Sequence, residues 1–166
     1  MLKTKITRNF DNTITIITPK KVRFSEYFVN YHELTCTINI DQQEIVFGKY
    51  NSWEYEDDDM ANDSYADEIS PVYTFSDFAK DLLGCIEKSY IWEMIFDDRY
   101  DSPRIDAPMW LHEELCELTE FMHEVRNLLV LSELLPIEYT EEFHAGKHTL
   151  KKENWLYKQF EEVLNS

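Results

Sequence analysis

The chain has 166 residues and a mass of 20.0 kDa, of which 43% are hydrophobic and 14% aromatic. This composition supplies a core for one compact domain and argues against intrinsic disorder, despite a net charge of −17. The three glycines, Gly48, Gly84 and Gly146, lie too far apart for a P-loop, a dinucleotide-binding loop or a nucleophile elbow. With a pI near 4.5, the chain is not expected to bind nucleic acid or an anionic membrane directly.

Export and membrane signals are missing from the sequence pattern. The first ten residues alternate polar and apolar side chains, and the longest aliphatic run, Leu128 to Leu131, is far shorter than a transmembrane helix. The odd set of Cys36, Cys85 and Cys116 matches neither a disulfide framework nor a zinc motif, so each is expected to be a buried thiol. We therefore expect a soluble, cytoplasmic protein.

The N-terminal third has the pattern of β-strands. Residues 13–16 are β-branched and alternate in polarity, and a further strand is expected between Val22 and Tyr31. Apolar residues with period two and a turn at residues 41–43 predict a hairpin from His32 to Tyr50; these residues are Leu34, Cys36, Ile38 and Ile40. Residues 1–50 are therefore expected to form an antiparallel sheet of three or four strands, with one apolar face.

The rest of the chain has the pattern of helices. Thr74 to Asp77 resembles a capping box at a helix start, whereas residues 89–96 fit either a helix or a strand. The strongest element is a long amphipathic helix from Asp106 to Leu135, closed by Pro136. Its apolar stripe comprises Leu111, Leu115, Leu118, Met122, Val125 and Leu129. A short helix from Thr140 to Gly146 and a last helix around Phe160 complete the prediction.

Strands followed by helices predict an α+β fold rather than alternating β-α-β units. We interpret residues 1–166 as a single domain. Within it, residues 1–50 are mainly strands, 51–73 form an acidic connection, and 74–166 are mainly helices.

Negative charge is concentrated in the middle of the chain. Residues 1–49 carry a net charge of +2, residues 50–106 a net charge of −12 and residues 107–166 a net charge of −7. The long helix also carries carboxylates at helical spacing, Glu113, Glu117, Glu120 and Glu124, which we expect on a solvated face opposite the apolar stripe.

Aromatic residues are interleaved with the acids of the middle section. Such residues anchor protein interfaces, while carboxylates steer the association of basic partners. We therefore expect a protein-binding surface formed by Glu54, Tyr55, Glu56, Asp57, Asp58, Asp59, Asp63 and Tyr65, with a second patch at Asp97, Asp98 and Asp101. The alternative is a solvated loop whose charge only maintains solubility.

The run from Trp53 to Asp59, together with the size and acidity of the chain, resembles bacterial immunity proteins. These neutralise polymorphic or contact-dependent growth-inhibition toxins, which are often basic nucleases. The resemblance implies tight, toxin-specific and mainly stoichiometric binding. Because no arrangement of residues singles out a reaction, we expect a non-enzyme without a cofactor, and a monomer rather than a homodimer. It would bind a basic toxin domain, an RNase or a DNase, and cover the basic residues of its cleft with carboxylates.

Two alternatives remain open. The chain could be a small acidic secretion chaperone that dimerises through the stripe from Leu111 to Leu129. It could also be a small metalloenzyme, because Glu120 and His123, and likewise Glu141 and His144, have Glu-x-x-His spacing. This spacing is common by chance in a chain so rich in glutamate.

Overall fold

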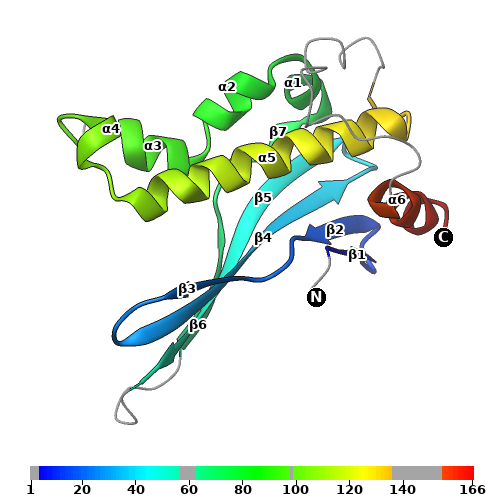
Figure 1. Cartoon of the computed structure of the whole chain (residues 1–166). Helices are drawn as coiled ribbons and strands as arrows, with labels where there is room; N and C mark the ends of the chain where they lie inside the picture. Colours follow the sequence, from blue (N-terminus) through cyan, green and yellow to red (C-terminus); the bar gives the residue numbers. More distant parts are fainter. Residues whose placement is uncertain (1–3, 57–62, 98, 136–154) are drawn as a thin grey trace.

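The computed structural model describes residues 4–56, 63–97, 99–135 and 155–166. An antiparallel sheet carries helices on one face, which confirms the α+β fold (Figure 1). The strands are β1 (Lys5–Arg8), β2 (Thr13–Ile17), β3 (Lys21–Phe24), β4 (Phe28–Asn39), β5 (Glu44–Tyr55), β6 (Asp63–Glu68) and β7 (Tyr73–Thr74). The helices are α1 (Phe75–Lys80), α2 (Leu82–Glu87), α3 (Tyr90–Phe96), α4 (Pro103–Asp106), α5 (Met109–Leu131) and α6 (Trp155–Asn165).

The sheet is built around the long hairpin of β4 and β5, which pair along their whole length. Two strands share each outer edge of this hairpin: β2 and β3 pair with β4, and β6 and β7 pair with β5. The sheet is therefore larger than the three or four strands expected. Part of the presumed acidic connection, residues 51–73, lies in β5, β6 and β7. Strand β6 is not predicted from the sequence, because half of its residues (DSYADE) are acidic and acidic residues are uncommon in strands.

The apolar core lies between one half of the sheet and the helices. Alternate residues of β4 (Leu34, Cys36 and Ile38) point inward, as the period of two predicts. Phe47 of β5 lies at the centre, with its ring centroid 5.8 Å from that of Phe78 and 5.7 Å from that of Phe121. Edge-to-face and tilted ring contacts of this kind fix the helical layer on the sheet.

Helix α5 is shorter than predicted at both ends. Ala107 precedes Pro108 and takes an extended conformation (φ −68°, ψ 138°), so the helix begins after the proline and α4 is separate. At the other end, Ser132 is the C-cap and Glu133 has a φ of 62°. The apolar stripe is buried within this chain, as Leu118, Met122, Val125 and Leu129 are fully enclosed.

Side-chain caps define the shorter helices. The Thr74 hydroxyl accepts a hydrogen bond from the Asp77 amide at 3.1 Å, which confirms the predicted helix start. Ser89 caps α3 by accepting from the Trp92 amide, so residues 90–96 are helical rather than extended. The helix expected from Thr140 to Gly146 lies outside the described residues.

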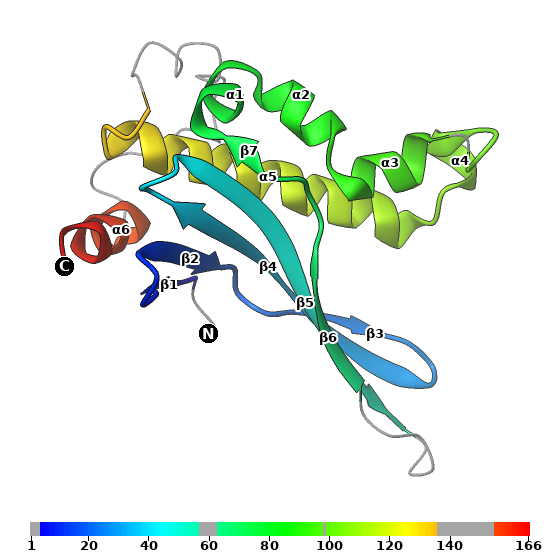
Figure 2. The same cartoon turned by 180° about the vertical axis from the view of Figure 1, so that it is seen from behind.

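The C-terminal helix α6 is present as expected and covers strand β1 at one edge of the sheet. The Arg8 guanidinium donates to the backbone carbonyls of Val163 and Leu164 at 3.1 and 3.0 Å. Figures 1 and 2 show α6 beside β1 and β2, at the end of the sheet remote from β3 and β6. The C-terminal helix thus covers the sheet edge formed by the N-terminal strand.

Two findings concern membrane spans and the cysteines. No helix in the described ranges combines the length and apolarity needed to cross a bilayer. Cys36 and Cys85 are buried, but Cys116 is exposed on α5, so the expectation of three buried thiols is wrong for it. Cys116 falls between positions of the apolar stripe and faces away from the core.

Candidate protein-binding surface

The far end of the sheet forms a projection that we call the β-arm, residues 21–32, 48–56 and 63–68. Figures 1 and 2 show it extending away from the helical layer. Glu54 and Tyr55 end β5, Glu56 follows them, and Asp63 and Tyr65 lie in β6. The register pairs Trp53 with Asp63 and Asn51 with Tyr65, so both halves of the predicted acidic run lie on neighbouring strands. Asp57, Asp58 and Asp59 lie outside the described residues.

The second predicted patch is separate from the β-arm. Asp97 is the C-cap of α3 and Asp101 lies just before α4, while Asp98 is outside the described residues. Figure 2 shows the α3–α4 segment at the top of the view and the outer end of β6 at the bottom. The structure therefore does not unite the two sets of acids into one surface.

Aromatic side chains organise the inner face of the β-arm. Trp53 and Tyr65 stack across β5 and β6 with ring centroids 5.1 Å apart, and Phe28 meets Tyr55 edge-on at 6.1 Å. Such cross-strand pairs stabilise neighbouring strands while leaving ring faces available to a partner. Tyr65 is 40% exposed, and at the β3–β4 turn Phe24 and Tyr27 are exposed as well.

Acidic side chains lie on both faces of these strands. Glu54, Glu56, Asp67 and Glu68 are all exposed. The Tyr31 hydroxyl donates to Glu54 Oε2 at 3.2 Å, which orients that carboxylate on the outer face. The pKa of Tyr31 is raised, first by desolvation and then by the neighbouring Glu54 charge.

Buried ion pairs attach the β-arm to α5. Glu114 is only 3% exposed and accepts hydrogen bonds from Arg23 at 3.1 Å and from Lys49 at 3.2 Å. The same Arg23 guanidinium lies over the Trp110 ring, 5.8 Å from its centroid. One carboxylate on a helix thus ties two strands of the sheet, β3 and β5, to the helical layer.

A second carboxylate of α5 repeats this arrangement. Glu117 lies 3.1 Å from Lys21 Nζ and 3.1 Å from Nε2 of the buried His32. Partial burial works against ionisation of Glu117, but hydrogen bonds from His32 and Lys21 outweigh it and hold its pKa below the ordinary value. The carboxylate stripe of α5 was expected to be a solvated face. This expectation is wrong for Glu117, which is bonded to two side chains of the sheet.

The same stripe borders a cleft of about 140 Å³ between α5 and the β2–β3 connection. Glu120 is exposed at its rim, whereas Glu124 is half-buried. The pKa of Glu124 is raised, chiefly by desolvation and then by the charge of Glu120. Glu113 alone of the four predicted acids has no part in the described clusters and points to solvent.

The anchoring residues are not among the predicted site residues, although the sequence carries a signal for them. Extending the inward phase of Leu34 and Cys36 back along the strand places His32 and Asn30 on the same face. Both are buried. A polar residue on an inward phase indicates a buried partner, but nothing in the sequence identifies that partner as a carboxylate of α5.

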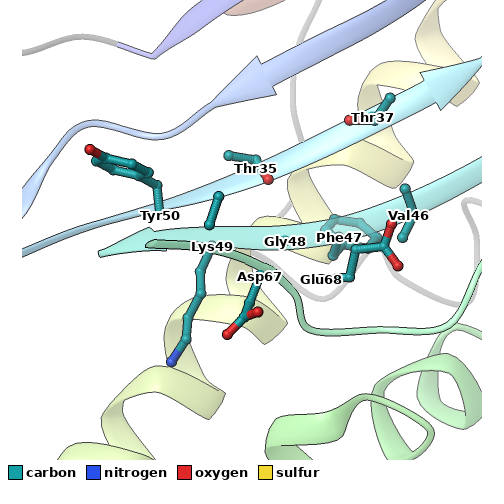
Figure 3. A pocket seen from close by; sticks show the side chains of 10 residues that line it. Thr35, Thr37, Val46, Phe47, Gly48, Lys49, Tyr50, Asp67 and Glu68 are labelled. Carbon is teal, nitrogen blue, oxygen red and sulfur yellow. The ribbon is translucent and has the colours of Figure 1, made fainter. Parts of the chain in front are cut away.

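The outer face of the sheet carries a shallow groove of about 240 Å³ above Gly48. Figure 3 shows Thr35, Thr37 and Tyr50 on one side of the strands, and Lys49 and Asp67 on the other. Their polar groups do not converge on one point. The groove thus lacks the focused set of groups that a catalytic site requires.

The residues suggested for a metalloenzyme are not assembled into a site that the structure describes. His123 lies on α5, and His144 falls outside the described residues. Elsewhere on α5, His112 Nε2 lies 2.8 Å from the Pro103 carbonyl oxygen. Within the described ranges, no group of three or more His, Cys, Asp or Glu side chains could hold a metal ion.

Comparison with known proteins adds no assignment. No family model, no curated protein sequence and no solved structure matches this chain.

Proposed function

We propose that this protein is an inhibitor of the immunity type, which binds and neutralises a basic protein toxin through its β-arm. The observation that carries the proposal is the pairing of β5 with β6. It places exposed acids on the same two strands as the stacked rings of Trp53 and Tyr65, with Asp67 on the face of the rings and Glu68 on the opposite face. Aromatic anchors surrounded by charges of one sign are typical of surfaces that bind an oppositely charged protein.

The attachment of the β-arm supports the same reading. The buried Glu114 joins Arg23 and Lys49, and Glu117 joins Lys21 and His32, so much of the cationic charge of β3 and β5 is neutralised internally. Among the residues that the structure describes, Glu56, Asp67 and Glu68 form no such ion pair. The surface therefore presents negative charge on a scaffold that is fixed before a partner arrives, which reduces the entropy lost on binding.

The second patch has a different role in this proposal. Because Asp97 and Asp101 lie away from the β-arm, they add to the long-range field that attracts a cation but do not contact the same part of a small partner. Replacing both by Asn should slow association slightly and leave the dissociation rate unchanged.

The proposal is tested by capturing the partner and measuring inhibition. The tagged chain would be used for a pull-down from its native cells at moderate salt, and the bound protein identified by mass spectrometry. We expect one basic protein, recovered near one-to-one, whose nuclease or other toxic activity is blocked by an equimolar amount of this chain.

A matched pair of variants locates the surface. The test variant carries Glu56→Gln, Asp67→Asn and Glu68→Gln on the β-arm. The control carries Glu87→Gln, Glu161→Gln and Glu162→Gln, three exposed acids on α2 and α6. Both change the net charge equally, so loss of capture and inhibition in the β-arm variant alone supports the proposal. Equal loss in both variants, or in neither, contradicts it.

A further inference from the structure

The two edge strands of the sheet, β1 and β6, differ in what covers them. β1 ends the strand order on one side and packs against α6, to which Arg8 is bonded. β6 ends it on the other side and pairs with β5 alone among the described strands. The residues from Ser64 to Glu68 are all exposed. An edge strand of this kind can accept a further strand from another molecule.

The hydrogen-bond pattern shows which backbone groups face outward. The Ile69 amide donates to the Phe47 carbonyl at 2.9 Å, and the register continues with Lys49 opposite Asp67. Antiparallel ladders alternate, so Asp67 exchanges its bonds with β5, whereas the N–H and C=O of Ala66 and Glu68 point away from it. The bonds of Leu34, which lies opposite Lys49, agree with this alternation. Its amide and carbonyl are bonded to Thr18, on the side of β4 away from β5, so the backbone groups of Lys49 point toward β6.

The outward edge ends at a defined point. The Ile69 carbonyl accepts a hydrogen bond from the Tyr90 amide at 2.8 Å, so the start of α3 occupies the position that follows Glu68. An added strand would therefore extend from Glu68 toward the outer end of β6. It would pass beside the stacked Tyr65 ring on one face of the sheet.

Charge indicates the chemistry of the added strand. A second copy of this chain, pairing β6 with β6, would place two strands that are each half acidic side by side. Like charges on neighbouring strands oppose pairing, whereas opposite charges favour it. An extended segment with lysine or arginine at alternate positions would place these cations on a single face of the sheet, beside Asp67 or beside Glu68 according to its register.

We propose that the outer edge of β6 binds an extended, basic segment of the partner by β-strand addition, through the backbone groups of Ala66 and Glu68. This rests on the proposed function and specifies how the β-arm engages its partner. The acids of β6 then have two effects: they disfavour self-pairing and they select a basic strand.

The proposal is tested with a capped heptapeptide of alternating lysine and valine, titrated into the full chain. Its control is the same peptide with N-methyl groups on every second backbone amide, namely on the amides that would donate to β6. This control keeps every charge of the peptide but removes those hydrogen-bond donors. We expect the first peptide to bind, to slow hydrogen exchange at the Ala66 and Glu68 amides, and to lose affinity about three- to tenfold or more on N-methylation. Equal binding of both peptides, or no slowing at those two amides, overturns the proposal.

A variant of the chain gives an independent test with the captured partner. Ala66→Pro removes one outward donor without removing a bond to β5, and Ala66→Val retains that donor. We expect Ala66→Pro to weaken partner binding and Ala66→Val to leave it unchanged. If Ala66→Pro binds the partner as the wild type does while the β-arm acid variant does not, strand addition is wrong and the proposed function stands. If the acid variant also binds normally, the proposed function fails as well.

Discussion

At the scale of single residues, Glu114 carries much of the attachment between the β-arm and α5. Its carboxylate is buried and is shared by Arg23 and Lys49. Glu114→Ala would leave two cations without their anion, and breaking a buried pair in this way typically costs about 3–5 kcal/mol. We expect a loss of this size in the free energy of unfolding, measured by urea denaturation. Glu113→Gln, at the exposed neighbouring position, should change it by less than about 0.5 kcal/mol.

Glu117 and Glu124 predict opposite pH effects. The pKa of Glu117 is lowered in the folded protein, so its stabilisation is full above the ordinary value of 4.5 and is lost as the pH falls through the folded pKa. The pKa of Glu124 is raised in the folded protein. Its contribution to stability is therefore full below the ordinary value of 4.5 and is lost as the pH rises through the folded pKa.

We therefore expect Glu117→Gln to lower stability at pH 7 by about 1–3 kcal/mol, with the difference from the wild type shrinking below pH 4.5. Glu124→Gln should raise stability at pH 7 and have no effect in acid. Urea unfolding at a series of pH values measures both. A difference from the wild type that is constant across the series, for either variant, contradicts the assignment.

At the scale of elements, Gly48 sets how closely β4, β5 and β6 approach one another. A Cβ atom at this position would lie 2.8 Å from Thr35 Oγ1 and 2.9 Å from the Asp67 carbonyl oxygen. Gly48→Ala should therefore destabilise the protein by about 1–3 kcal/mol, as overpacking generally does. Adding Thr35→Ala should recover only part of the loss, because the Asp67 contact is with backbone. Full recovery, seen as an unchanged melting temperature, would show that β6 can move.

The sequence predicts some elements well and others poorly, for physical reasons. Alternation identifies β2, β4 and β5, and the apolar stripe identifies α5, because these elements bury one face in the common core. β6 buries little and half of its residues are acids, so no period marks it. Its strand conformation comes from pairing with β5, a tertiary effect that a single segment does not encode.

The same distinction applies to the candidate site. Composition alone places Glu54, Tyr55, Glu56, Asp63 and Tyr65 in an acidic-aromatic group, and pairing of β5 with β6 brings these residues onto neighbouring strands. The distance between this group and Asp97 could not be predicted. It depends on how α3 and α4 sit on the sheet rather than on local pattern.

At the scale of the whole molecule, the burial of the α5 stripe bears on oligomeric state. Leu111, Leu118 and Leu129 pack inside this chain, so they do not offer the dimer seam that the chaperone alternative requires. Charge repulsion also disfavours self-association of a chain with a net charge of −17. We expect a single monomeric species in sedimentation velocity at micromolar concentration. A stable dimer would restore the chaperone alternative.

In the proposed function, the acids of the β-arm attract and hold a basic partner. The most direct measurement is the association rate constant with the captured partner as a function of salt, for the wild type and for the two matched charge variants. We expect a rate that falls steeply with salt for the wild type and for the α2–α6 control, and a rate that is lower and falls less steeply with salt for the β-arm variant. The same salt dependence in all three proteins would contradict it.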